Sequence, residues 1–263
     1  MIASVRRLVR TVEASRPAQS GRHGGLAYSL WLPTGDRPGS RFKGPAPRPR
    51  GGVVVLHGAR SCKESHYDYA RVLMAAGLAA ITFDQRGHGE SEGPMDGRAL
   101  EDVRSMAQLL REACGPGIPI ALRGSSMGGY LAILAARGVA AEAVVAICPA
   151  SGEGLRRAIR AGTIGFDADV LALDAMMARN DLHAEVSSLE IPMLLLHAAG
   201  DEQVPVEHSR ELAKGLRSPA SRLIVVPGGH HRSVQHDAEL QAVSVRFIEQ
   251  ALGAASRTAA ESL

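Results

Sequence analysis

The chain has 263 residues, a formal net charge of +3 and only 3% aromatic residues. This length fits one large α/β domain or two small ones with a sizeable core, while the few aromatics and scattered arginines argue against nucleic-acid binding. Three widely spaced cysteines, Cys62, Cys114 and Cys148, argue against a disulfide framework or a zinc site and favour a reducing cytoplasm.

Targeting and membrane segments are not expected from the sequence. Residues 1–21 contain arginines but no continuous apolar region of the kind that signal peptides have. The longest apolar stretch, residues 73–83, is too short to span a bilayer. We therefore expect a soluble cytoplasmic protein with no membrane span.

Apolar runs alternate with helical patterns along the chain. Strands are predicted at residues 26–33, 52–58, 78–84, 118–124, 142–149, 191–198 and 222–228. Helices are predicted at residues 65–77, 97–115, 127–138, 207–217 and 238–253. Residues 33–52 are rich in Pro and Gly and predict an exposed connection between two strands. Continuous apolar strands separated by helices indicate a mostly parallel sheet that is covered on both faces. Functional groups of such sheets gather at the carboxyl ends of the strands.

A glycine-rich turn follows the predicted strand at residues 118–124. Ser126 stands at the centre of the pattern G-x-S-x-G, which Gly124 opens and Gly128 closes, whereas Ser125 is out of frame. A nucleophile on a sharp strand-to-helix turn needs small residues two positions before and after it, because its backbone is strained. Ser126 is therefore the candidate nucleophile, and a purely structural turn is the alternative.

A serine nucleophile needs a general base, and the base needs an orienting carboxylate. Both follow later strands, in the chain order serine, acid, histidine that such an elbow requires. Asp201 is the candidate acid, with a turn or helix-capping aspartate as its alternative. His231, three residues beyond a glycine, is the candidate base. The other residues near these positions are Glu202, which is out of frame, His230, which is the second choice for the base, and His236, which is expected on the following helix. No carboxylate-rich or cysteine-rich ligand set accompanies the histidine pair, so no metal is expected.

The segment after the predicted strand 52–58 is the candidate oxyanion loop. The amides of Ala59 and Met127 are the expected donors to an oxyanion, and Gly58 allows a close approach of the backbone. His57 is expected to hold this loop. Arg60 either contacts an acidic substrate or is solvated, and solvation is favoured.

Three polar residues lie at the end of the predicted strand 78–84 and just after it. Asp84, Arg86 and His88 could form a catalytic cluster. A hydrogen-bonded structural loop is the favoured interpretation.

Five sequence blocks together resemble the α/β-hydrolase superfamily. They are residues 56–59 (LHGA), 83–91 (FDQRGHGES), 124–129 (GSSMGG), 200–205 (GDEQVP) and 228–231 (GGHH). The chain looks most like the small-esterase, monoacylglycerol-lipase-like and dienelactone-hydrolase-like branches. The resemblance implies a mostly parallel eight-stranded sheet with helices on both faces, a short cap after the sixth strand, and a triad of Ser126, Asp201 and His231. Dienelactone hydrolases carry cysteine and haloalkane dehalogenases aspartate at the position of Ser126, so the serine favours oxygen-ester chemistry.

The cap is expected at about residues 150–190 of a single domain covering residues 1–263. Its apolar residues either pack on the sheet or bind an acyl chain. Its arginines, Arg156, Arg157 and Arg160, are expected on a solvated helix face, with attraction of a negative group as the alternative.

The sequence as a whole predicts a serine hydrolase. Its expected substrates are small-molecule carboxylic esters with short to medium acyl chains, cleaved through an acyl-enzyme without a metal or organic cofactor. A thioesterase, a peptidase or amidase, and a non-catalytic ligand-binding protein remain alternatives, because one fold hosts many chemistries. A homo-oligomer is possible.

Overall fold

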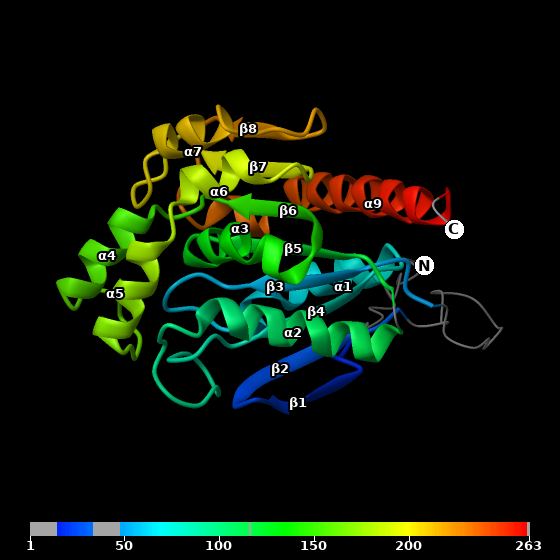
Figure 1. Ribbon diagram of the computed structural model, residues 1–263, viewed down its shortest axis with the longest axis horizontal. Coiled ribbons are helices and arrows are strands. Elements are labelled where there is room, and N and C mark those ends of the chain that lie inside the picture. Colours follow the sequence, from blue (N-terminus) through cyan, green and yellow to red (C-terminus); the bar gives the residue numbers. More distant parts are fainter. Residues whose placement is uncertain (1–14, 34–47, 116, 262–263) are drawn as a thin grey trace, which may run out of the picture.

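The computed structural model describes residues 15–33, 48–115 and 117–261. In this part of the chain, one sheet holds eight strands in the order β1-β2-β4-β3-β5-β6-β7-β8 (Figure 1). The strands are β1 (Gln19–His23), β2 (Leu26–Trp31), β3 (Gly52–Leu56), β4 (Ala79–Phe83), β5 (Ile120–Ser125), β6 (Ala141–Ile147), β7 (Met193–Ala198) and β8 (Arg222–Val226). Only the pairs β1–β2 and β2–β4 are antiparallel. The predicted fold class is therefore confirmed.

The first strand is the one that the apolar pattern missed. All five residues of β1 are exposed, so the strand contains no apolar run. It pairs with β2 from Gln19 opposite Leu30 to His23 opposite Leu26. A short polar strand at the edge of a sheet discourages pairing with another chain.

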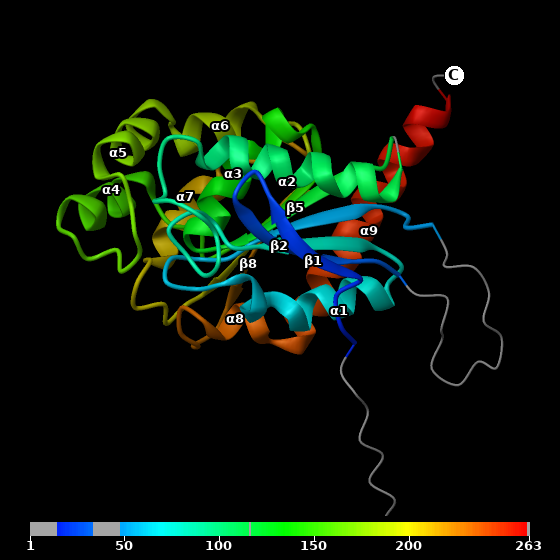
Figure 2. The same ribbon diagram turned by 90° about the horizontal axis from the view of Figure 1, so that it is seen from below.

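Helices cover both faces of the sheet (Figure 2). On one face lie α1 (Tyr67–Ala75), which a 3₁₀ turn at Lys63–His66 precedes, α8 (Ser233–His236) and the long α9 (Ala238–Glu261). On the other face lie α2 (Ala99–Cys114), α3 (Met127–Val139), α6 (Leu182–Ser188) and α7 (Val206–Ala213). Each face has its own apolar cluster, because alternate residues of the central strands point to opposite sides.

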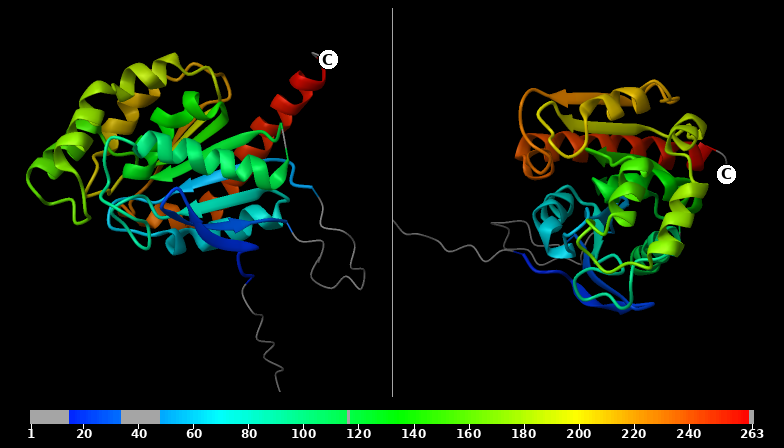
Figure 3. Two further views of the ribbon diagram at one scale, coloured as in Figure 1. Left: turned by 60° about the horizontal axis from the view of Figure 1, so that its bottom comes forward. Right: turned by 90° about the vertical axis from the view of Figure 1, so that its left-hand side faces the viewer.

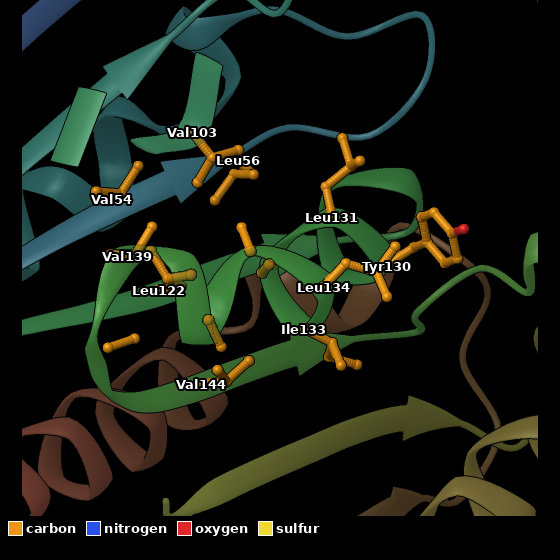
Figure 4. Close-up of a cluster of buried hydrophobic side chains, with 14 of the residues drawn as sticks. Val54, Leu56, Val103, Leu122, Tyr130, Leu131, Ile133, Leu134, Val139 and Val144 are labelled. Atoms are coloured by element: carbon orange, nitrogen blue, oxygen red, sulfur yellow. The ribbon is translucent and has the colours of Figure 1, made fainter. Parts of the chain in front are cut away.

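The α3 helix is the centre of the larger cluster (Figure 4). Eleven of its thirteen residues are buried, so it is apolar all round, as a fully enclosed helix must be. Its side chains Leu131 and Ile133 lie among residues of β3, β6 and α2, such as Leu56, Val144 and Val103. Since α3 begins immediately after Ser126, this packing fixes the position of that serine.

The expected cap lies between β6 and β7. It contains α4 (Gly152–Arg160), α5 (Val170–Arg179) and then α6. Figure 1 and the left panel of Figure 3 show α4 and α5 projecting beyond the carboxyl ends of the strands. Two predicted surface arginines join these helices: Arg156 and Arg160 both pair with Asp174 of α5, at 3.0 and 2.8 Å. The solvated helix face predicted for them is confirmed for Arg157 and Arg160, whose side chains are 76% and 58% exposed, whereas the side chain of Arg156 is only 32% exposed.

Two expectations fall partly outside the described residues. They are the absence of a signal peptide, which concerns residues 1–21, and the exposed connection at residues 33–52. Within the described ranges, none of the helices combines the length and the apolar character needed to cross a membrane.

Candidate active site

The turn between β5 and α3 presents only one of its two serines. Ser125 is the last residue of β5 and is buried, with 5% exposure. Ser126 follows it with φ 53° and ψ −119° and is partly exposed. A positive φ is unusual for a residue with a side chain, and such strain is often kept at functional sites. The structure therefore supports the choice of Ser126 as the exposed hydroxyl.

The glycines around Ser126 are required by the backbone. A Cβ at Gly124 would overlap the carbonyl oxygen of Gly128. A Cβ at Gly128 would lie 2.5 Å from the carbonyl oxygens of His57 and Leu56, much closer than real Cβ contacts. The elbow is thus packed so tightly between β3, β5 and α3 that only hydrogen fits at both positions.

Asp201 and His231 meet although they follow different strands. The Nδ1 of His231 donates to Oδ2 of Asp201 at 2.7 Å. The other oxygen of Asp201, Oδ1, accepts the backbone N–H groups of Gln203 at 2.8 Å and Val204 at 2.9 Å. Asp201 therefore acts as the turn aspartate that was its alternative role and also holds the histidine.

The environment of Asp201 keeps its carboxylate charged. Burial by itself would raise the pKa of Asp201, but the amide of Val204, the ring of His231 and the amide of Gln203 outweigh it, so that the pKa lies below its usual value. Because an ionised carboxylate can only accept, the proton of the His231 ring sits on Nδ1. The Nε2 atom then carries the lone pair that a general base needs.

Ser126 and His231 line the same pocket. This cavity of about 350 Å³ is lined by Gly58, Ala59, Arg60, Ser61, Ser125, Ser126, Gln203, His231, Arg232 and Gln235. Among the described residues, no direct hydrogen bond joins the Ser126 hydroxyl to the His231 ring. Catalytic hydrogen bonds are often long without substrate and shorten when it binds.

The predicted oxyanion loop lies beside Ser126. Ala59 lines the pocket, and a Cβ at Gly58 would be only 3.2 Å from the Ser126 Cβ, so this glycine allows the loop to approach. Met127 is the first residue of α3, and the helix itself leaves the N–H of that position without an acceptor.

His57 holds this loop, as its predicted role requires. It is fully buried. Its Nε2 accepts the N–H of Gln85 at 3.0 Å, and its Nδ1 donates to the carbonyl of Gly58 at 2.7 Å. Burial, and to a smaller degree the charge of the neighbouring His88, lower the pKa of His57 to about 4. The ring is therefore neutral near pH 7, and both nitrogens are used.

The segment after β4 forms a hydrogen-bonded loop, the interpretation favoured from the sequence. Asp84 accepts the backbone N–H of Lys63 at 2.7 Å and its ammonium at 2.8 Å. Arg86 pairs with Asp102 at 2.9 Å, and His88 donates from Nδ1 to the carbonyl of Arg86 at 3.0 Å. None of the three predicted residues of this loop lines the pocket.

The alternatives to Asp201 and His231 have other partners. Glu202 accepts the backbone N–H of His231 at 3.3 Å. His230 is exposed, and its backbone N–H donates to the hydroxyl of Ser233 at 3.0 Å. His236 ends α8 and pairs with Asp68 at 3.0 Å.

Sequence reasoning did not identify His197 as a neighbour of Asp201. His197 is fully buried near the end of β7. Its Nε2 donates to the carbonyl of Val204 at 2.9 Å and lies 3.4 Å from Oδ2 of Asp201, while Nδ1 accepts from Ser209 at 2.7 Å. Its place at a strand end, four residues before the acid, was the available signal.

Cys148 is a second neighbour that the sequence did not reveal. Its sulfur lies within 4.8 Å of ligand atoms of Asp201 and His231, so that the three could surround a metal ion. Metal binding needs a thiolate. Burial, and to a smaller degree the charge of Asp201, raise the pKa of the Cys148 thiol to about 12. The cluster therefore offers a protonated thiol and a histidine already bonded to its acid, a poor ligand set near pH 7.

Comparison with known proteins identifies the family. A family model described as serine aminopeptidase, S33, matches residues 47–164, and one described as TAP-like protein matches residues 175–252. Together with the eight-stranded sheet, these matches decide the assignment. The chain belongs to the α/β-hydrolase superfamily.

Several known proteins resemble this chain along most of its length. Protein YfhR of Escherichia coli O157:H7 is 27% identical, with 80% of this chain and 74% of the relative aligned. A monoacylglycerol lipase of Mycolicibacterium smegmatis is 26% identical over 78% of this chain and 85% of its own. The crystal structure of the Paleococcus ferrophilus monoacylglycerol lipase has a TM-score of 0.62 at 21% identity, covering 87% of this chain and 98% of that one. A structural likeness at this identity supports the fold.

Proposed function

We propose that this protein is a serine hydrolase that cleaves carboxylic esters of short to medium acyl chains through an acyl-enzyme. The observation that carries the proposal is the 2.7 Å bond between His231 and Asp201 at the wall of the pocket that Ser126 also lines. The Mycolicibacterium relative, a monoacylglycerol lipase, supports ester hydrolysis as the reaction class.

In the first half of the reaction, His231 removes the proton of the Ser126 hydroxyl as its oxygen attacks the ester carbonyl. Asp201 holds the ring and stabilises the imidazolium that forms. The tetrahedral intermediate collapses, His231 protonates the departing alcohol, and the acyl group stays on Ser126. In the second half, His231 activates water in the same way, and the acid leaves.

The negative oxygen of each intermediate would be held by two backbone amides. They are those of Ala59, on the loop that Gly58 allows to approach, and of Met127, at the start of α3. Donors fixed in advance at the place where charge develops commonly supply a large part of the rate enhancement. No step requires a metal ion or an organic cofactor.

Two other reaction classes would use the same groups. The family model that matches residues 47–164 is described as a serine aminopeptidase, so that amide cleavage is one of them, and thioester cleavage is the other. A panel of p-nitrophenyl esters, acyl-CoA thioesters and aminoacyl amides distinguishes them. We expect kcat/KM to be highest for the esters.

A fluorophosphonate probe tests the proposed nucleophile. The wild-type protein should form a covalent adduct at Ser126 that mass spectrometry of the digested protein locates. Ser126→Ala should abolish the adduct and lower kcat by about 10⁴- to 10⁶-fold, whereas Ser125→Ala should keep the adduct. A wild-type protein that neither reacts with the probe nor hydrolyses any ester would instead be a non-catalytic ligand-binding protein.

A further inference from the structure

The wall of the candidate active site carries two arginines. Arg60 follows the candidate oxyanion loop and Arg232 follows His231, and both residues line the pocket. The lining contains no aspartate or glutamate, and its other residues are one glycine, one alanine, three serines, two glutamines and the histidine. The pocket next to Ser126 is therefore positively charged and offers few apolar groups.

Neither guanidinium has a partner within the described residues. No hydrogen bond or ion pair joins the side chain of Arg60 or of Arg232 to another described residue. Other arginines of the chain do have acidic partners, for example Arg86 with Asp102 at 2.9 Å and Arg156 with Asp174 at 3.0 Å. Two arginines without a protein partner at one pocket leave ten N–H donors that can bind an anion.

The position of Arg60 is built into the fold. Its φ is 59°, an uncommon value for a residue with a side chain. Its aliphatic part crosses the backbone of the cap at Gly165, where a Cβ would collide with the Cγ and Cδ atoms of Arg60. The strained backbone at one end and the glycine at the other hold this side chain between the oxyanion loop and the cap.

We propose that the substrate is an ester that carries a carboxylate or phosphate group, which Arg60 and Arg232 bind while Ser126 attacks the ester carbonyl. This inference rests on the proposed function and names its substrate class. Arginine suits both anions, because its planar fork can form two parallel hydrogen bonds with either. A long unbranched acyl chain suits the pocket less well, because few apolar side chains line it.

Matched pairs of esters test the charge preference. On the acyl side, mono-4-nitrophenyl adipate is compared with 4-nitrophenyl hexanoate, which has the same chain length without the carboxylate. On the alcohol side, butyryl glycerol phosphate is compared with butyryl glycerol in a pH-stat. We expect kcat/KM to be higher for the anionic member of at least one pair by about tenfold or more at low salt, and this ratio to fall as NaCl is added. The pair that responds distinguishes a carboxylate from a phosphate.

Single substitutions then locate the preference. Arg60→Gln and Arg232→Gln should each bring the anionic-to-neutral ratio of kcat/KM down toward 1. Arg246→Gln is the matched control, since Arg246 is an exposed arginine of α9 that does not line the pocket, and it should keep the wild-type ratio. Equal rates for both members of both pairs, or a preference that both pocket variants keep, would overturn the inference.

Failure of the proposed function would look different. A protein that hydrolyses neutral and anionic esters equally and reacts with the fluorophosphonate is a serine hydrolase without the proposed charge preference. A protein that hydrolyses neither and does not react with the probe lacks the proposed activity. Protection experiments on the wild-type protein give an additional readout: adipate should slow the fluorophosphonate reaction more than hexanol does.

Discussion

The two oxygens of the Asp201 carboxylate have different tasks. Oδ1 accepts the N–H groups of Gln203 and Val204 and so fixes the turn after β7, while Oδ2 accepts the ring N–H of His231. One residue thus joins the local fold of the turn to the orientation of the candidate base. Substitutions that remove only one of these tasks can separate them.

Asp201→Asn should impair catalysis while the fold is retained. The amide oxygen can still accept from Gln203 and Val204, but the amide NH₂ would then face Nδ1 of His231 and favour the wrong tautomer. A change of this kind costs about 10⁴-fold in kcat in a serine protease, and we expect a loss of this order in ester hydrolysis. Circular dichroism should show the wild-type fold. An Asn variant with a kcat within tenfold of wild type would contradict the proposed role.

Asp201→Ala provides the comparison. It leaves two N–H groups of the turn without their acceptor, so that we expect a further loss of about 2 kcal/mol in the free energy of unfolding relative to the Asn variant. Urea denaturation of both variants measures this difference. Equal stabilities would mean that the turn does not depend on Oδ1.

At the scale of secondary structure, the elbow depends on the close approach of three elements. Gly128, in the first turn of α3, faces the carbonyl oxygens of Leu56 and His57, at the end of β3 and the start of the candidate oxyanion loop. Gly128→Ala would push backbone against backbone, which cannot relax as a flexible side chain does. We expect a loss of about 2–4 kcal/mol in the free energy of unfolding, measured by urea denaturation.

Gly97→Ala is the matched control for this prediction. Gly97 lies before α2, and the nearest atom to an added Cβ is the carbonyl oxygen of Ala172, at an ordinary contact distance of 3.6 Å. Its substitution should change the free energy of unfolding by less than about 0.5 kcal/mol. Similar losses in the two variants would show that tight packing at Gly128 is not the cause.

A buried arginine joins the strand of Ser126 to the helix after His231. Arg123 of β5 is 1% exposed, and its guanidinium lies 3.8 Å from the centre of the Tyr69 ring. It donates to the carbonyl of Gln235 in α8 at 3.0 Å and, more weakly, to Nδ1 of His66 at 3.3 Å. This contact holds α8, and with it the segment that follows His231, against β5.

Arg123→Met should therefore destabilise the protein. The carbonyl of Gln235 and Nδ1 of His66 would lose their donor in a buried environment, and the contact with Tyr69 would lose its charge. Because the desolvation of the arginine is also removed, we expect a net loss of only about 2 kcal/mol in the free energy of unfolding. Arg222, which is exposed and lies 5.6 Å from the Phe247 ring, is the control. Arg222→Met should change stability by less than about 0.5 kcal/mol, and the prediction fails if Arg123→Met does no more.

The sequence predicted the elements that have strong local signals. Seven strands follow from apolar runs, and α1, α2, α3, α7 and α9 follow from helical patterns, whereas α4, α5, α6 and α8 were not predicted. Ser126, Asp201 and His231 could be chosen because each follows a predicted strand. The strand β1 was not predicted because its five residues are exposed and form no apolar run. The pairing of Arg156 and Arg160 with Asp174 was not predicted, because it depends on how α4 and α5 pack together, and no local sequence pattern encodes that packing. Cys148 lies beside Asp201 for a similar reason, because this contact depends on β6 and β7 being neighbours in the sheet. His197 did have a local signal, its place four residues before Asp201, which the pattern of apolar runs does not use.

At the scale of the whole molecule, several histidines are buried in their neutral form. Burial, and to a smaller degree the charge of Arg123, lower the pKa of His66 well below its usual value. Burial also lowers the pKa of His57 to about 4. In α7, burial and the neighbouring His183 lower the pKa of His208 to about 4. Each of these neutral rings therefore makes the folded state less favourable as the pH falls.

These histidines predict the direction in which stability depends on pH. Their pKa values are lower in the folded protein than the value of about 6.5 in an unfolded chain, so that between about pH 6.5 and pH 4 the unfolded chain binds more protons. Stability must therefore fall as the pH drops through this window and should change little from these groups above pH 7. His57 and His66 together correspond to a slope of up to about 3 kcal/mol per pH unit.

Urea denaturation at several pH values between 7.5 and 5 measures this slope. We expect the midpoint to change little down to pH 7 and to fall steeply below pH 6. His208→Gln should reduce the slope by up to the contribution of one proton, because the variant lacks the partly buried ring that is neutral in the folded state and binds a proton on unfolding. A free energy of unfolding that stays constant from pH 7 to pH 5 would show that the buried rings do not take up protons on unfolding, and a slope that His208→Gln leaves unchanged would exclude that ring from the effect.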